Sequence, residues 1–295
     1  MQERRCASPA VFGTYYVNLG MQAVTQAQIK KVTGNEVADE PDMLATEEPM
    51  EIRLSYYTPA GYVTKNISVT MRTPGNDLEL AKGFLYTEGI IARRADVTET
   101  RHASEQNGNV VYVVLAQHVT PDIAGLERNF YTTSSCGVCG KASIEAVRTS
   151  CNILDTKDNI QVTHNTIYAL PATLRAQQNV FEYTGGLHGC AIFDTAGNLV
   201  MTREDVGRHN ALDKLIGAAM DNELLPLGDH ILLLSGRASF ELVQKAAMAG
   251  IKMIAAVGAP SSLAVQLADE WGMTLVGFLR GERFNIYTGA QRIVI

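Results

Sequence analysis

The sequence predicts an α/β protein, and three observations on its C-terminal half lead to that fold class. Short apolar runs rich in β-branched residues recur there, as expected for buried strands. Segments of about a dozen residues with helical periodicity separate these runs. Loops of glycine and other small residues stand between the strands and the helices. This rhythm is typical of βαβ units with a substantially parallel sheet, whose loops after the strands gather along one edge.

The larger domain is expected over residues 146–295. Its first two strands, 188–194 and 198–204, are expected to pair as a hairpin because Ala196-Gly197-Asn198 forms a turn between them. The remaining strands are expected at 230–236, 252–258 and 274–280. Helices are expected between and before them, at 209–220, 239–250 and 261–272.

A smaller α+β domain is expected over residues 48–130. Residues 50–58 and 62–73 alternate between polar and apolar side chains and contain β-branched residues, which predicts a second hairpin. A helix over 77–91 and a further strand over 109–116 complete this domain. Both domains together leave room for a well-buried core.

Composition and charge exclude several classes of protein. The net charge of −6 over 295 residues disfavours a general nucleic-acid binder. No apolar run reaches the roughly 20 residues that span a membrane. Residues 1–47 are polar, small and acidic and lack a compact apolar region, so we expect a poorly ordered leader and no signal peptide. The odd count of five cysteines fits a reducing compartment, so we expect a cytoplasmic protein.

A cysteine pair forms the strongest chemical motif. Cys136 and Cys139 are separated by two residues in a loop expected over 131–145. If a helix begins near Gly140, its positive end lies beside both sulfurs, and Lys141 adds a positive charge. Both effects favour the thiolate, which is the nucleophile in sulfur exchange. The pair therefore predicts a site that accepts and presents sulfur.

Other functions of the cysteine pair fit the sequence less well than sulfur transfer does. A structural zinc site needs two further ligands, and the compact pair His188 and Cys190 is separated by one residue only, against the usual two to four. A structural disulfide is disfavoured in a reducing compartment. Thioredoxin-like exchange stays open from the spacing, although no strand directly precedes the pair. Cys151 and Cys190 are expected to be buried as small apolar residues.

Loops beside the predicted strands suggest a phosphate site. They are 204–210, 235–241, 258–264 and 277–284. Their arginines are Arg208, Arg237, Arg280 and Arg283. Free N–H groups at helix starts and guanidinium groups both bind phosphate, and α/β proteins bind ligands at the carboxyl edge of the sheet. Each loop alone is more often just a turn with a helix cap, but three such loops with four arginines on one sheet edge favour a binding site. His209 is either a phosphate donor or general acid, or a histidine satisfied at a helix start.

These motifs and their order resemble the FdhD family, the formate dehydrogenase accessory sulfur carriers. The resemblance covers nearly the whole chain from residue 44 onward. The segments that carry it are 44–55, 69–91, 134–141, 184–193, 204–217, 235–251, 258–269 and 277–288. Nothing is carried over onto the leader.

The resemblance implies a cytoplasmic homodimer with a cytidine-deaminase-like, three-layer C-terminal domain. It implies a sulfurtransferase that accepts sulfur from a cysteine desulfurase as a persulfide on Cys136, with Cys139 as its partner. The sulfur then passes to the molybdenum (or tungsten) bis(molybdopterin guanine dinucleotide) cofactor destined for formate dehydrogenase. No resident metal, nucleic acid or membrane is expected. The implied cofactor contacts are Phe278, Leu279, Arg280, Gly281, Glu282 and Arg283.

Two rival functions follow from the same residues. A zinc-dependent deaminase needs an H-x-E segment and a P-C-x-x-C pair. No histidine here is followed two residues later by glutamate, and Ser135 stands where the proline is required, so this function is excluded. The second rival is a non-catalytic chaperone that only escorts the cofactor or the apoenzyme. It leaves the cysteine pair unexplained.

Overall fold

The computed structural model describes residues 23–104, 107–122 and 160–295. The loop expected over 131–145, with both cysteines of the pair, lies outside the described residues, and so does Cys151. No helix among the described residues is long and apolar enough to cross a membrane.

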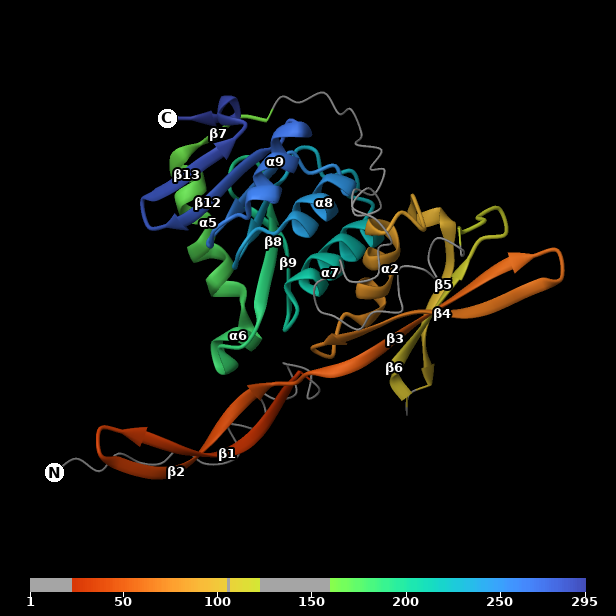
Figure 1. Cartoon of the computed structure of the whole chain (residues 1–295), viewed down its shortest axis with the longest axis horizontal. Helices are drawn as coiled ribbons and strands as arrows, with labels where there is room; N and C mark the ends of the chain where they lie inside the picture. Colours follow the sequence, from red (N-terminus) through yellow and green to blue (C-terminus); the bar gives the residue numbers. More distant parts are fainter. Residues whose placement is uncertain (1–22, 105–106, 123–159) are drawn as a thin grey trace.

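A six-stranded mixed sheet forms the centre of the C-terminal part (Figure 1). In spatial order its strands are β13 (Arg283–Thr288), β12 (Thr274–Arg280), β11 (Met253–Ala256), β10 (Ile231–Leu234), β8 (His188–Phe193) and β9 (Leu199–Asp205). The predicted β8–β9 hairpin is confirmed. Only the pairs β10–β11 and β11–β12 are parallel. The strands on either side of these three pair with them in the antiparallel direction. The expectation of a substantially parallel sheet is therefore correct only for its centre.

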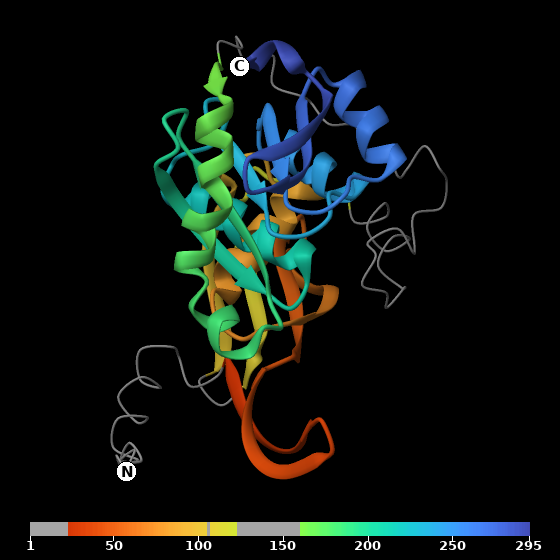
Figure 2. The ribbon, with the colours of Figure 1, turned by 90° about the vertical axis from the view of Figure 1, so that its left-hand side faces the viewer.

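Helices cover both faces of this sheet. They are α5 (His164–Gln177) on one face, and α7 (Arg208–Asp221), α8 (Phe240–Met248) and α9 (Ser262–Glu270) on the other. Alternate side chains of each strand point to opposite faces. Ala191 and Phe193 therefore pack with α5, while Cys190 and Ile192 pack with the other helices. Figure 2 shows α5 and α9 on opposite sides of the strands. The C-terminal part thus has three layers, and its likeness to cytidine deaminases stays a prediction.

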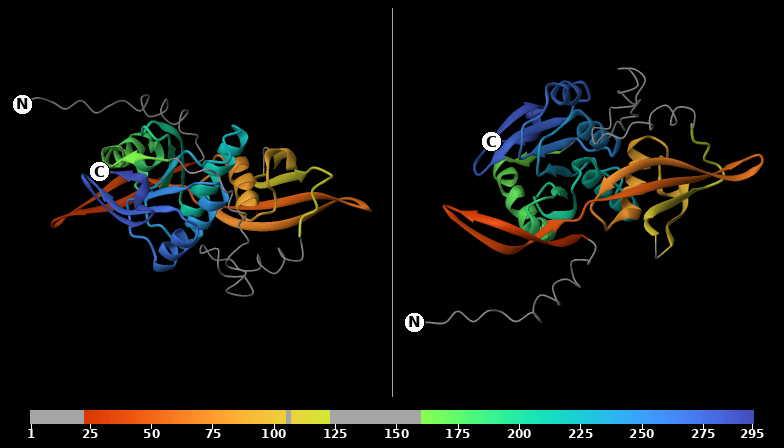
Figure 3. Two further views of the ribbon diagram at one scale, coloured as in Figure 1. Left: turned by 90° about the horizontal axis from the view of Figure 1, so that it is seen from above. Right: turned by 60° about the horizontal axis from the view of Figure 1, so that its bottom comes forward.

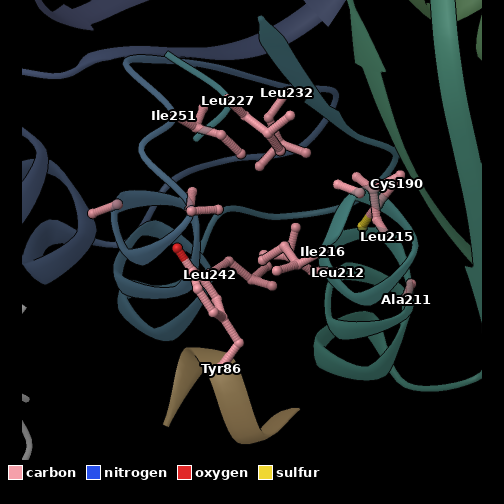
Figure 4. Close-up of a cluster of buried hydrophobic side chains, with 14 of the residues drawn as sticks. Tyr86, Cys190, Ala211, Leu212, Leu215, Ile216, Leu227, Leu232, Leu242 and Ile251 are labelled. Carbon is pink, nitrogen blue, oxygen red and sulfur yellow. The ribbon is translucent and has the colours of Figure 1, made fainter. Parts of the chain in front are cut away.

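The smaller part is a four-stranded sheet with one helix. Its strands lie in the order β4 (Gly61–Arg72), β3 (Glu48–Thr58), β6 (Asn107–Leu115) and β5 (Val97–Ser104). The helix α2 (Asp77–Thr87) packs between this sheet and α7. Tyr86 of α2 points into the same apolar cluster as Leu212 of α7 and Leu242 of α8 (Figure 4). One continuous core therefore joins the two expected domains.

A hairpin of β1 (Val24–Thr33) and β2 (Glu36–Ala45) lies in the stretch where a poorly ordered leader was expected. It reaches away from the body of the molecule (Figure 1, Figure 3). Gly34 has φ of +62°, which suits the two-residue turn, and Lys30 donates to Asp39 across the strands at 2.7 Å. The expectation of a poorly ordered leader is wrong for these residues. The sequence does not indicate the two strands, because charged residues alternate here without the apolar face that marks a buried strand.

Short elements complete the described chain. They are α6 (Asn179–Thr184), β7 (Val162–Thr163), β14 (Ile293–Val294) and the 3-10 turns η1 (Arg94–Asp96) and η2 (Ala290–Arg292). The strands β7 and β14 pair in parallel. Arg292 supports this end of the chain by donating to the Gly272 carbonyl at 2.7 Å.

A buried ion pair connects α7 and α8, and its lysine also contacts α2. Lys245 of α8 donates to both carboxylate oxygens of Asp213 in α7 at 3.0 Å, and to the Thr87 hydroxyl of α2 at 2.8 Å. Burial raises the pKa of Asp213, and Lys245 opposes that rise. The carboxylate therefore depends on its lysine partner to stay charged inside the protein.

We expect Lys245→Met to lower the free energy of unfolding by about 3–5 kcal/mol near neutral pH, because it leaves Asp213 buried without a counter-charge. The folded-state pKa of this carboxyl then rises further above its unfolded value. Protons bind more strongly to the folded state, so the loss should shrink as pH falls. Urea titrations at neutral and acidic pH measure this. Lys30→Met, which removes an exposed partner of Asp39, is the control. An equal loss of stability at both pH values would mean that the loss does not come from the buried charge of Asp213.

Candidate functional site

Four strand ends meet at one edge of the six-stranded sheet. Asp205, at the end of β9, lies in register with His188, the first residue of β8. The strands β10, β11 and β12 run parallel to one another and end at this same edge. The loops that follow touch, since Ala238 forms a bridge with Pro260 and Phe278 donates its N–H to the Gly258 carbonyl at 3.0 Å. The predicted gathering of the loops at the carboxyl edge is confirmed.

Two glycines allow this close approach. A Cβ on Gly258 would lie 2.9 Å from the backbone nitrogen of Arg237, so a larger residue there would push the loops apart. A Cβ on Gly236 would lie 3.2 Å from Nδ1 of His188, so the imidazole lies directly against this backbone. Ser235 fixes the start of β8 by accepting the Gly189 N–H at 2.9 Å. The edge is therefore a tightly packed backbone surface.

Three helices begin at this edge. The cap of α9 is complete, because the Ser261 hydroxyl accepts the Ala264 N–H at 3.2 Å. Gly207 precedes α7 and Ser239 precedes α8, and neither provides a side-chain acceptor to its helix. Free N–H groups and the positive ends of the helix dipoles therefore face the edge. Such helix starts bind anions.

The charged side chains give the edge a positive excess. Asp205 is fully buried and paired with Lys214 at 2.7 Å, so its charge is compensated. Arg208 and Arg237 form no ion pair with any described residue. The Nε of Arg208 is also buried and has no hydrogen-bond partner among the described residues. Two guanidinium groups thus remain available to an anionic ligand.

The two histidines at the edge differ in their surroundings. His209 lies 3.4 Å from the Ser239 hydroxyl and 3.6 Å from the Glu241 carboxylate, which fits a histidine satisfied at a helix start. Burial raises the pKa of Glu241, but hydrogen bonds from His209 and Ser239 outweigh it and the pKa falls. His188 is partly buried, and its imidazole forms no hydrogen bond with a described residue. Burial and then Arg208 lower its pKa. Sequence reasoning assigned His188 no part in the anion site.

The segment expected to contact the cofactor extends this edge as a turn between β12 and β13. Phe278 has φ of +54° and is 42% exposed, whereas the Leu279 side chain is fully buried and can offer only its backbone to a ligand. The exposed residues of the turn are Arg280, Gly281, Glu282 and Arg283. The two arginines of the turn form no ion pair with a described residue, Glu282 included. The structure therefore leaves them accessible to a ligand.

The remaining cysteine predictions have different outcomes. Cys190 is 2% exposed in the core, as predicted, and burial raises the pKa of its thiol. Cys136 and Cys139 lie outside the described residues, so their geometry stays a prediction. Among residues 23–104, 107–122 and 160–295, no group of three or more potential metal ligands lies together.

Comparisons with known proteins agree on one family. The family model described as FdhD/NarQ family matches residues 45–294. The sulfur carrier protein FdhD of Streptomyces coelicolor is 51% identical, over 93% of this chain and 98% of its own. Its counterpart in Mycobacterium tuberculosis is 49% identical, over 92% and 99%. The crystal structure of a chain assigned as a formate dehydrogenase accessory protein, from Desulfotalea psychrophila, is 23% identical and matches with a TM-score of 0.72, over 92% of this chain and 100% of that one. The chain therefore belongs to the FdhD/NarQ family.

Proposed function

We propose that this protein carries sulfur as a persulfide on its CxxC pair and delivers it to a molybdenum bis(molybdopterin guanine dinucleotide) cofactor required by formate dehydrogenase. Family membership and the name of the relatives, sulfur carrier protein, support the carrier role. The observation that carries the cofactor assignment is the sheet edge, where uncapped helix starts and unpaired arginines favour a phosphate-bearing ligand.

The transfer step follows from thiol chemistry. The thiolate of Cys136 attacks the outer sulfur of a persulfide on the cysteine desulfurase. A new S–S bond forms on this chain, and the old S–S bond breaks to leave a thiolate on the desulfurase. Cys139, separated from Cys136 by two residues, would then attack the sulfur atom of Cys136, so that a Cys136–Cys139 disulfide forms and the outer sulfur leaves at the oxidation level of sulfide. The cofactor, when bound, would supply the metal centre for this sulfide, and the residues of the edge would hold its phosphates.

Mass spectrometry of the intact protein tests the carrier role. After incubation with a cysteine desulfurase and cysteine, the chain should gain the mass of one sulfur atom, and reduction should remove it. The gain should disappear when both Cys136 and Cys139 are replaced by alanine. No gain in the wild type would favour the chaperone that only escorts the cofactor.

The arginines of the β12–β13 turn should contribute to the cofactor site. We expect Arg280→Ala and Arg283→Ala each to weaken GDP binding by about one to two orders of magnitude, because a charge-assisted hydrogen bond contributes roughly 1.5–3 kcal/mol. Isothermal titration calorimetry measures this affinity. Arg94→Ala, an exposed arginine of the smaller part, is the control. Equal affinity in the wild type and both variants would place the pocket elsewhere.

A further inference from the structure

Three polar groups at the carboxyl edge have no partner among the described residues. They belong to different elements and lie around one surface. The imidazole of His188 lies against the Gly236 backbone, and the buried Nε of Arg208 stands at the start of α7. Arg237 follows Gly236 in the loop after β10, and its side chain is exposed. A buried polar atom without a partner is costly in a folded protein, and this applies here to the Nε of Arg208. Their shared position points to one anionic ligand.

We propose that His188 is a binding residue of this anion site and takes up a proton when a polyphosphate binds, so that it becomes a third cation beside Arg208 and Arg237. This inference rests on the proposed placement of the cofactor phosphates at the carboxyl edge. It adds a residue and a proton to that site.

The surroundings of His188 explain why the proton should arrive together with the ligand. The charged and titratable groups that act on it are Arg208 and His209 from α7, Arg237 from the loop after β10, and Asp205 from β9. Asp205 is compensated by Lys214, and His209 is held by Glu241. Burial and then the positive charge of Arg208 lower the pKa of His188, which keeps the imidazole neutral near pH 7.

A bound diphosphate reverses this balance. Its negative charges compensate the two arginines and offer oxygens to the imidazolium N–H groups, so the pKa of His188 rises in the complex. A group whose pKa is higher in the complex than in the free protein binds a proton on complex formation. Ligand affinity must then increase as pH falls through the range between the two pKa values. A rise of one pKa unit corresponds to about a tenfold gain in affinity.

The probe should carry no titrating phosphate of its own. Diguanosine diphosphate meets this need, because each phosphate of its bridge has one ester bond and one anhydride bond and so has no proton that titrates near neutral pH. Calorimetry across roughly pH 6 to 8, in two buffers of different ionisation enthalpy, gives the number of protons taken up. For the wild-type chain we expect an uptake approaching one proton and an affinity about three- to tenfold higher at the acidic end.

His188→Gln should still bind the probe but show no proton uptake and no pH dependence over this range. His164→Gln, at the start of α5, should behave as wild type. Nuclear magnetic resonance of the His188 ring in the unaltered chain, with and without the probe, gives the same answer without a substitution. Binding with no proton uptake, or an uptake that persists in His188→Gln, overturns this inference alone. Absence of any binding overturns the placement of the cofactor together with it.

Discussion

Cys136→Ala should reduce maturation of formate dehydrogenase to background. The substitution removes the thiolate that we propose to carry sulfur. Cys190, the cysteine among the described residues, cannot replace it, since it is buried and burial raises the pKa of its thiol. Dehydrogenase activity in cells that carry only the variant measures this effect. Thermal unfolding of the purified variant should match the wild type, because the sequence predicts an exposed loop around Cys136, where a substitution costs little stability.

Two cysteines provide matched controls. Cys151→Ser should leave maturation unchanged. Cys190→Ser should lower the unfolding temperature, because it places a hydroxyl in the core strand β8, yet the folded fraction should still carry sulfur. Normal dehydrogenase activity with Cys136→Ala would remove the carrier assignment. One zinc per chain, lost in the same variant, would replace it with a metal site.

Much of the central sheet can be predicted from the sequence, because its strands are apolar runs bounded by glycine loops. The predicted strand at 188–194 and the observed β8 differ at one end only. Strand direction is not encoded in such runs, and therefore the antiparallel pairing of β8 with β10 was not foreseen. The helix α5 was missed because Pro171 stands inside it, although Thr163 caps its start by accepting the Thr166 N–H.

The candidate site, like the sheet, can be predicted from the sequence only in part. Arg208, Arg237 and the turn at Arg280 follow predicted strands, so their place at the edge follows from the topology alone. His188 is the first residue of its strand, and it reaches the edge only because β8 runs opposite to β10. The predicted hairpin already brings His188 close to Asp205, but the pairing of β8 with β10, which brings this end of the hairpin to the arginine loops, was not predicted. The sequence therefore predicts the arginines at this edge but not the position of His188 beside them.

Two glycines allow α2 and α7 to cross with their backbones in contact. A Cβ on Gly83 of α2 would lie 1.8 Å from the Asp213 carbonyl oxygen, and a Cβ on Gly217 of α7 would lie 1.9 Å from the Glu79 carbonyl oxygen. Both obstacles are backbone atoms of the facing helix, which cannot rotate away as a side chain can. The crossing also carries the buried Asp213 and the ion pair of Arg203 with Glu79 at 2.6 Å, so separation of the helices weakens several contacts together.

We expect Gly217→Ala to lower the free energy of unfolding by at least about 3 kcal/mol, although alanine favours an isolated helix over glycine by roughly 1 kcal/mol. Gly83→Ala should cost a similar amount, and the double variant should cost clearly less than both losses added, because helices already separated by one methyl group have room for the second. Gly108→Ala, where nothing lies within 4 Å, is the control and should leave stability nearly unchanged. Urea unfolding of the four variants measures these differences. Wild-type stability in Gly217→Ala would mean that the two helices do not touch at this crossing, and additive losses would mean that the two glycines act at separate contacts.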